Sequence, residues 1–162
     1  PDEQSLGSSY LHGRLWKRPV EGPLAPFSVV EHTPPADELT NEYPIRLTSG
    51  RRLDSYNTGV QSGGFQSPIR HAETLDICES DGRRWDVASG EKVRVLSRRG
   101  EIEMTVRYTG DLRPGLAFTT FHFPDEAETN KLTNPAWDKK SGTADFKATA
   151  IRIEKLETAV GA

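Results

Sequence analysis

Residues 91–108, EKVRVLSRRGEIEMTVRY, decide the fold. In the first half of this stretch Val93 and Val95 alternate with polar side chains, which is the pattern of a strand with one face turned to a core. A polar turn at residues 98–101 follows, and the second half alternates in the same way. The pattern predicts a β-hairpin. Its two strands are expected at residues 91–97 and 102–108.

Further short strand patterns flank this hairpin on both sides, with turn signals roughly every 10 residues. One such turn contains Pro114 and Gly115, which set the backbone angles that a turn requires. Many short strands in one chain predict a small all-β barrel. The other strands are expected at residues 45–48 and 75–78, which both alternate as half-buried strands do, and at residues 116–121 and 147–156, with one short helix at residues 79–87.

Composition limits the possible classes of protein. The chain has 162 residues and a mass of 18.0 kDa, which suits one domain with an ordinary core. Its formal net charge of -3 argues against general nucleic-acid binding, which needs a basic excess. The single cysteine, Cys78, excludes an internal disulfide and a cysteine cluster for a metal or an iron–sulfur centre. With no apolar run of about 18 residues and no visible signal peptide, the sequence predicts a cytoplasmic protein without a membrane partner.

Residues 1–42 are predicted to be irregular, because five prolines fall between residues 19 and 35, and proline removes a backbone donor and restricts the residue before it. One strand is expected at residues 26–31. Aromatic side chains indicate that this arm packs on a surface; they are Tyr10, Trp16 and Phe27. The chain begins at Pro1 without an initiating Met, which suggests a fragment or processed segment of a longer protein, or equally a trimmed chain.

The strand at residues 45–48 runs into a polar loop that is suited to hold an anion. Gly lets a backbone approach a ligand closely, and hydroxyl, guanidinium and backbone N–H donors together suit a phosphate. An ordinary polar loop with surface arginines explains the same residues at least as well. The candidates are Thr48, Ser49, Gly50, Arg51 and Arg52.

Tyr56 and Asn57 continue this loop. An Asn amide can pair with a planar heterocycle and a Tyr can stack or donate, whereas the alternative is an Asx-type turn before Gly59. Two loops, residues 51–74 and 122–146, are long for a compact domain. Such loops usually are functional or cover another chain.

Three further candidates lie in the second half of the chain. His122, between two phenylalanines, is either a proton carrier or a histidine satisfied beside the core, and the sequence by itself favours the second interpretation. Asn134, together with Asp138, could bind a purine-like edge or simply form an Asn–Pro turn. Lys147 could meet a phosphate or only water. The sequence has no zinc-protease motif, metal-binding C-x-x-C or nucleophile elbow, so it predicts no metal ligand and no catalytic residue.

The order of these elements is more specific than any one of them. The stretches in question are YPIRLTSGR at 43–51, YNTG at 56–59, the hairpin, RPG at 113–115, FHFP at 121–124, LTNPAWD at 132–138 and FK at 146–147. Over residues 43–156 this series resembles the C-terminal molybdopterin-dinucleotide-binding domain of the dimethyl-sulfoxide-reductase superfamily. YNTG and LTNP are most similar to formate dehydrogenase alpha (large) subunits, and nitrate reductases match the last loop less well.

The resemblance implies a mainly β fold, a six-stranded double-psi β-barrel with short helices and long loops. It implies bis(molybdopterin guanine dinucleotide) with molybdenum or tungsten as the cofactor, bound jointly with domains outside this chain. It divides the chain into an irregular N-terminal arm, residues 1–42, that connects from a preceding domain, and a barrel domain, residues 43–158. The cofactor-binding residues that it implies are Thr48, Ser49, Gly50, Arg51, Arg52, Tyr56, Asn57, His122, Asn134 and Lys147.

The resemblance also implies partners, namely the iron–sulfur and molybdopterin domains of the same catalytic subunit. The family's metal-ligating cysteine or selenocysteine, with its partner histidine, has no counterpart in this chain. Cys78 falls in an expected barrel strand and is predicted to be a core thiol. The chain is therefore expected to bind and orient the cofactor of an oxidoreductase that converts formate to carbon dioxide, and not to be catalytic by itself.

Two alternatives stay open on the sequence alone. A double-psi barrel could instead serve as a non-enzymatic adaptor that binds proteins or peptides, as the N-terminal domains of some ATPases do. That function needs an exposed apolar groove and not the Arg, Asn and Lys loop residues. A natural standalone small subunit of a split molybdoenzyme is the other alternative.

Overall fold

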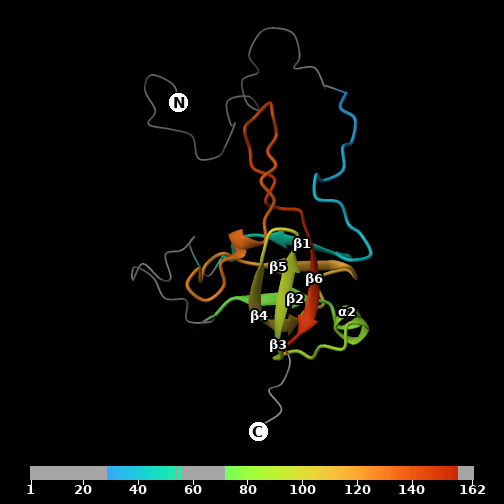
Figure 1. Cartoon of the computed structure of the whole chain (residues 1–162), viewed down its shortest axis with the longest axis vertical. Helices are drawn as coiled ribbons and strands as arrows, with labels where there is room; N and C mark the ends of the chain where they lie inside the picture. Colours follow the sequence, from blue (N-terminus) through green and yellow to red (C-terminus); the bar gives the residue numbers. More distant parts are fainter. Residues whose placement is uncertain (1–28, 54, 56–71, 157–162) are drawn as a thin grey trace, which may run out of the picture. The chain divides into compact units, whose positions relative to one another are not determined.

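The computed structural model describes residues 29–53, 55 and 72–156. From residue 34 onward these residues build a barrel of six strands, with a short helix and a 3-10 turn among the loops (Figure 1). The strands are β1 (Ile45–Ser49), β2 (Thr74–Ile77), β3 (Lys92–Ser97), β4 (Glu101–Tyr108), β5 (Leu116–Thr119) and β6 (Thr149–Lys155), and the helical elements are α2 (Glu79–Arg84) and η1 (Thr129–Lys131).

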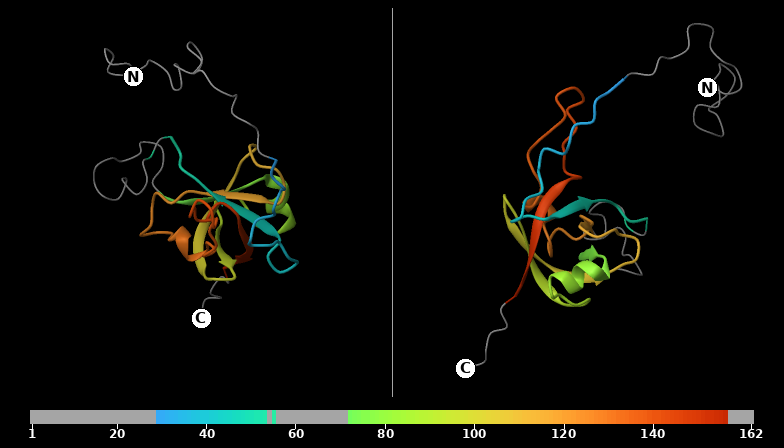
Figure 2. Two further views of the ribbon diagram at one scale, coloured as in Figure 1. Left: turned by 90° about the horizontal axis from the view of Figure 1, so that it is seen from above. Right: turned by 90° about the vertical axis from the view of Figure 1, so that its right-hand side faces the viewer.

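The sheet closes on itself in the order β1–β5–β2–β4–β3–β6, with β6 pairing back to β1. β1 runs parallel to β5 and β2 runs parallel to β4, whereas the other pairs are antiparallel. Neither parallel pair is consecutive in the sequence, so the chain crosses over between the two strands of each pair. Figure 2 shows the closed barrel from two further directions. The predicted mainly β fold with a six-stranded barrel is confirmed.

The hairpin at residues 92–108 forms as its alternation predicts. β3 and β4 pair with Val93 opposite Met104 and Val95 opposite Ile102, and all four side chains are buried. Equivalent apolar positions on the other strands complete one core, because side chains on alternate residues face the same side of a strand. The fully or almost fully buried members are Ile45, Leu47, Leu75, Ile77, Val106, Ala117, Leu132 and Ile151.

The alternation expected at residues 75–78 is wrong, because Asp76 is as buried as its apolar neighbours, with 2% of its surface exposed. Its carboxylate accepts hydrogen bonds from Thr74 Oγ1 and Arg107 Nε, both at 2.7 Å. A buried carboxylate is tolerated where charged partners and donors surround it. Cys78 lies just after β2, at the N-cap of α2, and not in a strand; the prediction that its thiol is buried is correct.

Several expected boundaries differ by a few residues. The helix expected at 79–87 ends at Arg84, and Asp86 adopts a φ of 53°, a left-handed conformation that ends a helix. β5 ends two residues earlier than expected, and β6 starts two residues later. Of the strand expected at 26–31, residues 29–31 are described, and they form no strand. No described strand pairs with them, and Val29 and Val30 are exposed.

Asp37 fastens the irregular segment 34–44 to the barrel. Its carboxylate accepts hydrogen bonds from Arg98 Nη1 and Arg99 Nη2, both at 2.6 Å, and from the Ala150 backbone N–H at 2.7 Å. Arg46 Nη1 donates to the Asp37 carbonyl at 2.6 Å. One nearly buried carboxylate therefore joins this segment to the β3–β4 turn and to β6. The division into an arm and a barrel domain at residue 42 stays a prediction.

Among residues 29–53, 55 and 72–156, we find no helix with the length and apolar character that a membrane span requires.

Candidate functional site

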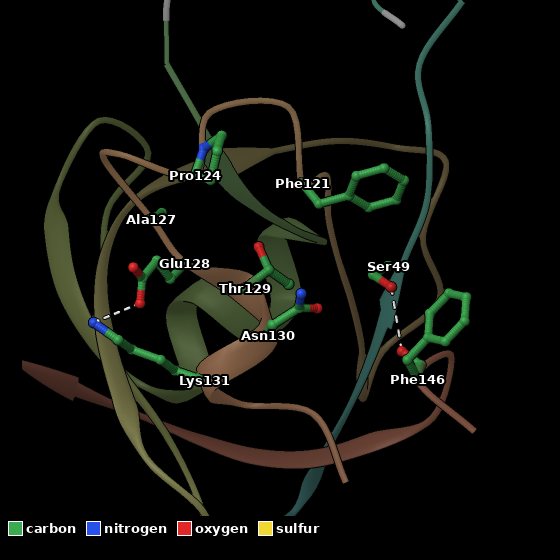
Figure 3. A pocket seen from close by; sticks show the side chains of 9 residues that line it. All are labelled: Ser49, Phe121, Pro124, Ala127, Glu128, Thr129, Asn130, Lys131 and Phe146. Atoms are coloured by element: carbon green, nitrogen blue, oxygen red, sulfur yellow. Dashed lines mark hydrogen bonds and ion pairs between the residues drawn. The ribbon is translucent and has the colours of Figure 1, made fainter. Parts of the chain in front are cut away.

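A cavity of about 760 Å³ opens beside the carboxyl ends of β1 and β5 (Figure 3). The two strands are parallel, so their ends meet at the same edge of the barrel. The volume lies in the range of small-molecule sites, about 300–1,000 Å³. The lining residues are Ser49, Phe121, Pro124, Ala127, Glu128, Thr129, Asn130, Lys131 and Phe146.

Ser49, the last residue of β1, is the one predicted site residue in this lining. Its Oγ donates to the Phe146 carbonyl at 3.2 Å, and its own carbonyl accepts a hydrogen bond from Lys147 Nζ at 2.6 Å. The Lys147 ammonium also lies 5.0 Å from the centre of the Phe146 ring. Lys147 therefore ties the last long loop to the end of β1. Thr48, one residue earlier, is half-buried and pairs in register with Phe118 of β5.

Gly50 owes its place to a close approach between β1 and β5. Its backbone N–H donates to the Thr119 carbonyl at 3.1 Å, and a Cβ built on it would lie 2.9 Å from the Phe118 ring. That separation is shorter than an ordinary contact, so a side chain at this position would require the Phe118 ring to shift.

We expect Gly50→Ala to lower the free energy of unfolding by about 1 kcal/mol, because the Phe118 ring must shift to admit the methyl group. Urea unfolding followed by tryptophan fluorescence measures this. Gly110→Ala is the matched control, since a Cβ at Gly110 would meet nothing within 4 Å. Equal stability of the two variants would contradict the packing role.

The Arg52 guanidinium binds a buried carboxylate of the barrel. It forms an ion pair with Asp76 through Nη2, and its Cζ lies 5.0 Å from the centre of the Phe118 ring. Arg107 binds the same carboxylate from β4. Arg51 is exposed beside it and does not line the cavity. The structure thus gives Arg52 a structural partner that the sequence did not reveal.

His122 is fully buried, and its ring also has a structural partner. Its Nε2 accepts a hydrogen bond from the Arg52 backbone N–H at 3.1 Å. Its own backbone N–H donates to Glu73 Oε1 at 2.6 Å. The satisfied histidine that the sequence favoured agrees with this geometry.

Asn134 shapes the loop in which it lies. Its Nδ2 donates to the Asp145 carbonyl and its Oδ1 accepts from the Ala136 N–H, both at 2.8 Å. The stretch that follows doubles back, with Trp137 bridged to Ala144, and projects from the barrel (Figures 1 and 2). Both sides of the Asn134 amide therefore hold the loop's own backbone.

At the tip of this projection, Asp138 closes a local turn. Its carboxylate accepts from the Ser141 hydroxyl at 2.5 Å and from the backbone N–H groups of Lys140 and Ser141 at 3.0 and 3.2 Å. The Ser141 hydroxyl, followed by these two N–H groups, lowers the pKa of Asp138 below its ordinary value. The carboxylate is thus an anchor for the turn.

The cavity wall opposite Ser49 comes from a segment that the sequence did not single out. Figure 3 shows Glu128 and Lys131 on this side, joined by an ion pair at 2.8 Å, with Asn130 beside them. Both partners of the pair are more than half exposed, so the pair is weak and open to exchange for a ligand. Thr129 is buried and donates to the Thr120 carbonyl at 2.8 Å. The sequence signal for this wall was the length of the loop at residues 122–146.

The ten predicted site residues are therefore only partly brought together. Ser49 lines the cavity, and Lys147 donates a hydrogen bond to the Ser49 carbonyl. Arg52, His122 and Asn134 support the surrounding loops. Tyr56 and Asn57 lie outside the described residues. In the part of the chain that the structure describes, His, Cys, Asp and Glu side chains form no group of three that could hold a metal ion.

The architecture is a closed β-barrel with a cavity of about 760 Å³ at the ends of two parallel strands, in which the strands hold the loops that line the cavity. The family model described as "Molydopterin dinucleotide binding domain" matches residues 45–150. The chain belongs to this family of molybdopterin dinucleotide-binding domains.

Similar proteins point to large oxidoreductase subunits. The chain is 37% identical to "F420-dependent formate dehydrogenase 2 subunit alpha" of Methanococcus maripaludis, over 93% of this chain and 22% of that protein. It is 32% identical to "F420-dependent formate dehydrogenase subunit alpha" of Methanocaldococcus jannaschii, over 96% of this chain and 23% of that protein. "Assimilatory nitrate reductase" of Haloferax mediterranei is 32% identical over 85% of this chain and 19% of that protein. The chain thus spans about a fifth of the length of these relatives.

The fold has a counterpart among solved structures. "Acetylene Hydratase from Pelobacter acetylenicus" matches with a TM-score of 0.62 at 13% identity, over 71% of this chain and 19% of that chain. At this identity the match supports the barrel fold alone.

Proposed function

We propose that this domain binds the nucleotide half of a molybdopterin guanine dinucleotide in a molybdenum- or tungsten-dependent formate dehydrogenase. The observation that carries the proposal is the cavity of about 760 Å³ beside Ser49, in a domain of this family. The 37% identity to a formate dehydrogenase alpha subunit supports the enzyme. The family match favours this function over the adaptor function.

The residues of the cavity fit a guanine nucleotide. Guanine presents two adjacent N–H donors, which a carboxylate accepts, and Glu128 offers one. Lys131 and Asn130 supply a cation and an amide suited to phosphate or ribose oxygens. Phe121 and Phe146 offer aromatic rings on which a base can stack. These five residues would hold the nucleotide.

The metal-bearing cofactor supplies the redox chemistry when bound, in which formate becomes carbon dioxide and gives up two electrons and a proton. This domain contributes binding and orientation, and it is not catalytic alone. The proposal includes, as partners, the iron–sulfur and molybdopterin domains of a larger catalytic subunit. It also includes a cytoplasmic location, with which a chain of one cysteine, the buried Cys78, is compatible.

Titration of the ¹⁵N-labelled 162-residue chain with guanosine monophosphate tests the binding step. We expect amide shifts at residues 49, 121 and 128–131, and binding at least about tenfold tighter than that of adenosine monophosphate, which lacks the paired N–H donors. Glu128→Gln is expected to remove most of this preference. Glu126→Gln, an exposed neighbour outside the cavity lining, is the matched control.

Equal shifts with both nucleotides, or shifts confined to residues outside the cavity, would argue against a guanine site. The enzyme itself is tested on the intact protein that carries this domain. Formate-dependent dye reduction, metal content and the nucleotide released by acid are the three measurements. Release of cytidine monophosphate in place of guanosine monophosphate would contradict the guanine form.

A further inference from the structure

Two buried side chains outside the cavity lining, Glu73 and His122, lie between the loops that surround the cavity. Glu73 directly precedes β2 and has 5% of its surface exposed, and His122 has none exposed. Neither residue lines the cavity of about 760 Å³.

Glu73 holds the segment that follows β5. Its carboxylate accepts hydrogen bonds from the backbone N–H groups of Thr120, His122 and Phe123, at 3.2, 2.6 and 3.0 Å, and from the Thr120 hydroxyl at 2.6 Å. Several N–H groups converging on one carboxylate make a strong, charge-assisted anchor. The residue that leads into β2 thus fixes the path of residues 120–123, which continue into the cavity wall at Phe121 and Pro124.

His122 connects the segment held by Glu73 to the loop after β1. Its backbone is held by Glu73, and its ring Nε2 accepts the Arg52 N–H at 3.1 Å. The Arg52 guanidinium returns to β2 through its ion pair with Asp76. The contacts therefore form a closed circuit from β2 through both loops and back to β2.

We propose that Glu73 and His122 are positioning residues that couple the loop at residues 50–53 to the loop at residues 120–124 and so keep the cavity preformed. The link to nucleotide affinity rests on the proposed function. The coupling between the two loops does not. A preformed site binds more tightly because its loops need no ordering when the ligand arrives.

Hydrogen exchange of the ¹⁵N-labelled 162-residue chain tests the coupling without any ligand. Glu73→Gln replaces an acceptor oxygen by an NH₂ group that faces N–H donors, so the segment after β5 should loosen. We expect the Arg52 amide to exchange at least about tenfold faster relative to the amides of β3 and β4. In the contacts described above, Glu73 reaches Arg52 by two routes, through His122 and through β2 and Asp76. The His122 variants separate the first route from the second. Glu126→Gln is the control and should leave the ratio unchanged.

Variants of His122 separate positioning from general packing. His122→Phe keeps a ring but removes the acceptor, and should release the Arg52 amide and weaken guanosine monophosphate binding about tenfold. His122→Gln returns an acceptor near the place of Nε2 and should restore both values to within about threefold. A packing role alone would make Gln the worse replacement, since Phe preserves more apolar volume.

Two results would overturn the inference. One is that the Arg52 amide of Glu73→Gln exchanges at the wild-type rate relative to the amides of β3 and β4. The other is unchanged nucleotide affinity in His122→Phe despite rapid exchange of the Arg52 amide. If the wild-type chain does not bind guanosine monophosphate at all, the proposed function fails, and the exchange ratios still decide whether the two loops are coupled.

Discussion

Asp37→Asn is expected to lower the free energy of unfolding by about 2–3 kcal/mol. The parent carboxylate, with 5% of its surface exposed, binds Arg98, Arg99 and the Ala150 N–H at 2.6–2.7 Å. Asparagine keeps the shape but removes the negative charge, and its NH₂ group turns a donor toward other donors. The two guanidiniums are partly exposed. Water can therefore hydrate them in the variant and offset part of the loss in stability.

The same contact predicts how stability depends on pH. Burial raises the pKa of Asp37, but the hydrogen bonds from Arg99, Ala150 and Arg98 and the charge of Arg99 outweigh it, so the pKa lies below the ordinary value of 3.8. A lowered pKa means that the unfolded chain takes up this proton first as the pH falls. The stabilisation is therefore fully present above 3.8 and is lost as the pH falls through the lower pKa of the folded state.

Urea unfolding of both chains between about pH 3 and pH 6 checks these two statements together. The stability difference should be constant near pH 6 and should shrink below the ordinary pKa of 3.8. Asp111→Asn is the control, because Asp111 is exposed and its carboxylate accepts a hydrogen bond from the nearby hydroxyl of Thr109. A difference that stays the same down to pH 3 would mean that packing, and not charge, explains the loss.

Gly82→Ala is expected to destabilise the barrel by about 2–3 kcal/mol, although alanine is the better helix former. The Tyr108 ring lies directly on α2 at this point, and a Cβ on Gly82 would overlap its hydroxyl and ring carbons. The Tyr108 hydroxyl donates to the Val87 carbonyl, which fixes the ring in place. Admitting the methyl group therefore breaks a hydrogen bond and moves an aromatic ring from the end of β4.

A double-mutant cycle with Tyr108→Ala measures this contact. In the Tyr108→Ala background, Gly82→Ala should be neutral or stabilising, because the overlap is gone and only the gain in helix propensity is left. Thermal unfolding of the four chains gives the coupling. The contact would be refuted if Gly82→Ala cost the same in both backgrounds.

The fold could be predicted because its evidence is local. Alternation at Val93 and Val95 and the turn before Ile102 depend only on neighbouring residues, and the expected hairpin forms. The alternation predicted for β2 is wrong for a reason that is not local in the sequence. Asp76 is buried because Arg52 and Arg107, 24 and 31 residues away in the sequence, bring charge to it.

Several candidate site residues have partners in the structure that the sequence could not reveal, for the same reason. Arg52 and Asn134 have the residue types of ligand-binding groups. In the structure, Arg52 binds the Asp76 carboxylate, 24 residues away, and Asn134 donates to the Asp145 carbonyl, 11 residues away. Glu73 was missed, because a single glutamate before a strand carries no pattern. Its role depends on the backbone of residues 120–123, which only the folded chain brings near.

The place of β6 has a consequence for how the protein is made. This strand is the last that the structure describes, yet it fills the gap between β1 and β3 and so closes the barrel. A ribosome must release nearly the whole domain before β1 gains its second neighbour, and Lys147, which secures the end of β1 at Ser49, emerges just before β6. The cavity beside β1 is therefore completed last. A chain that stops before β6 leaves β1 and β3 without their shared neighbour and cannot close the barrel.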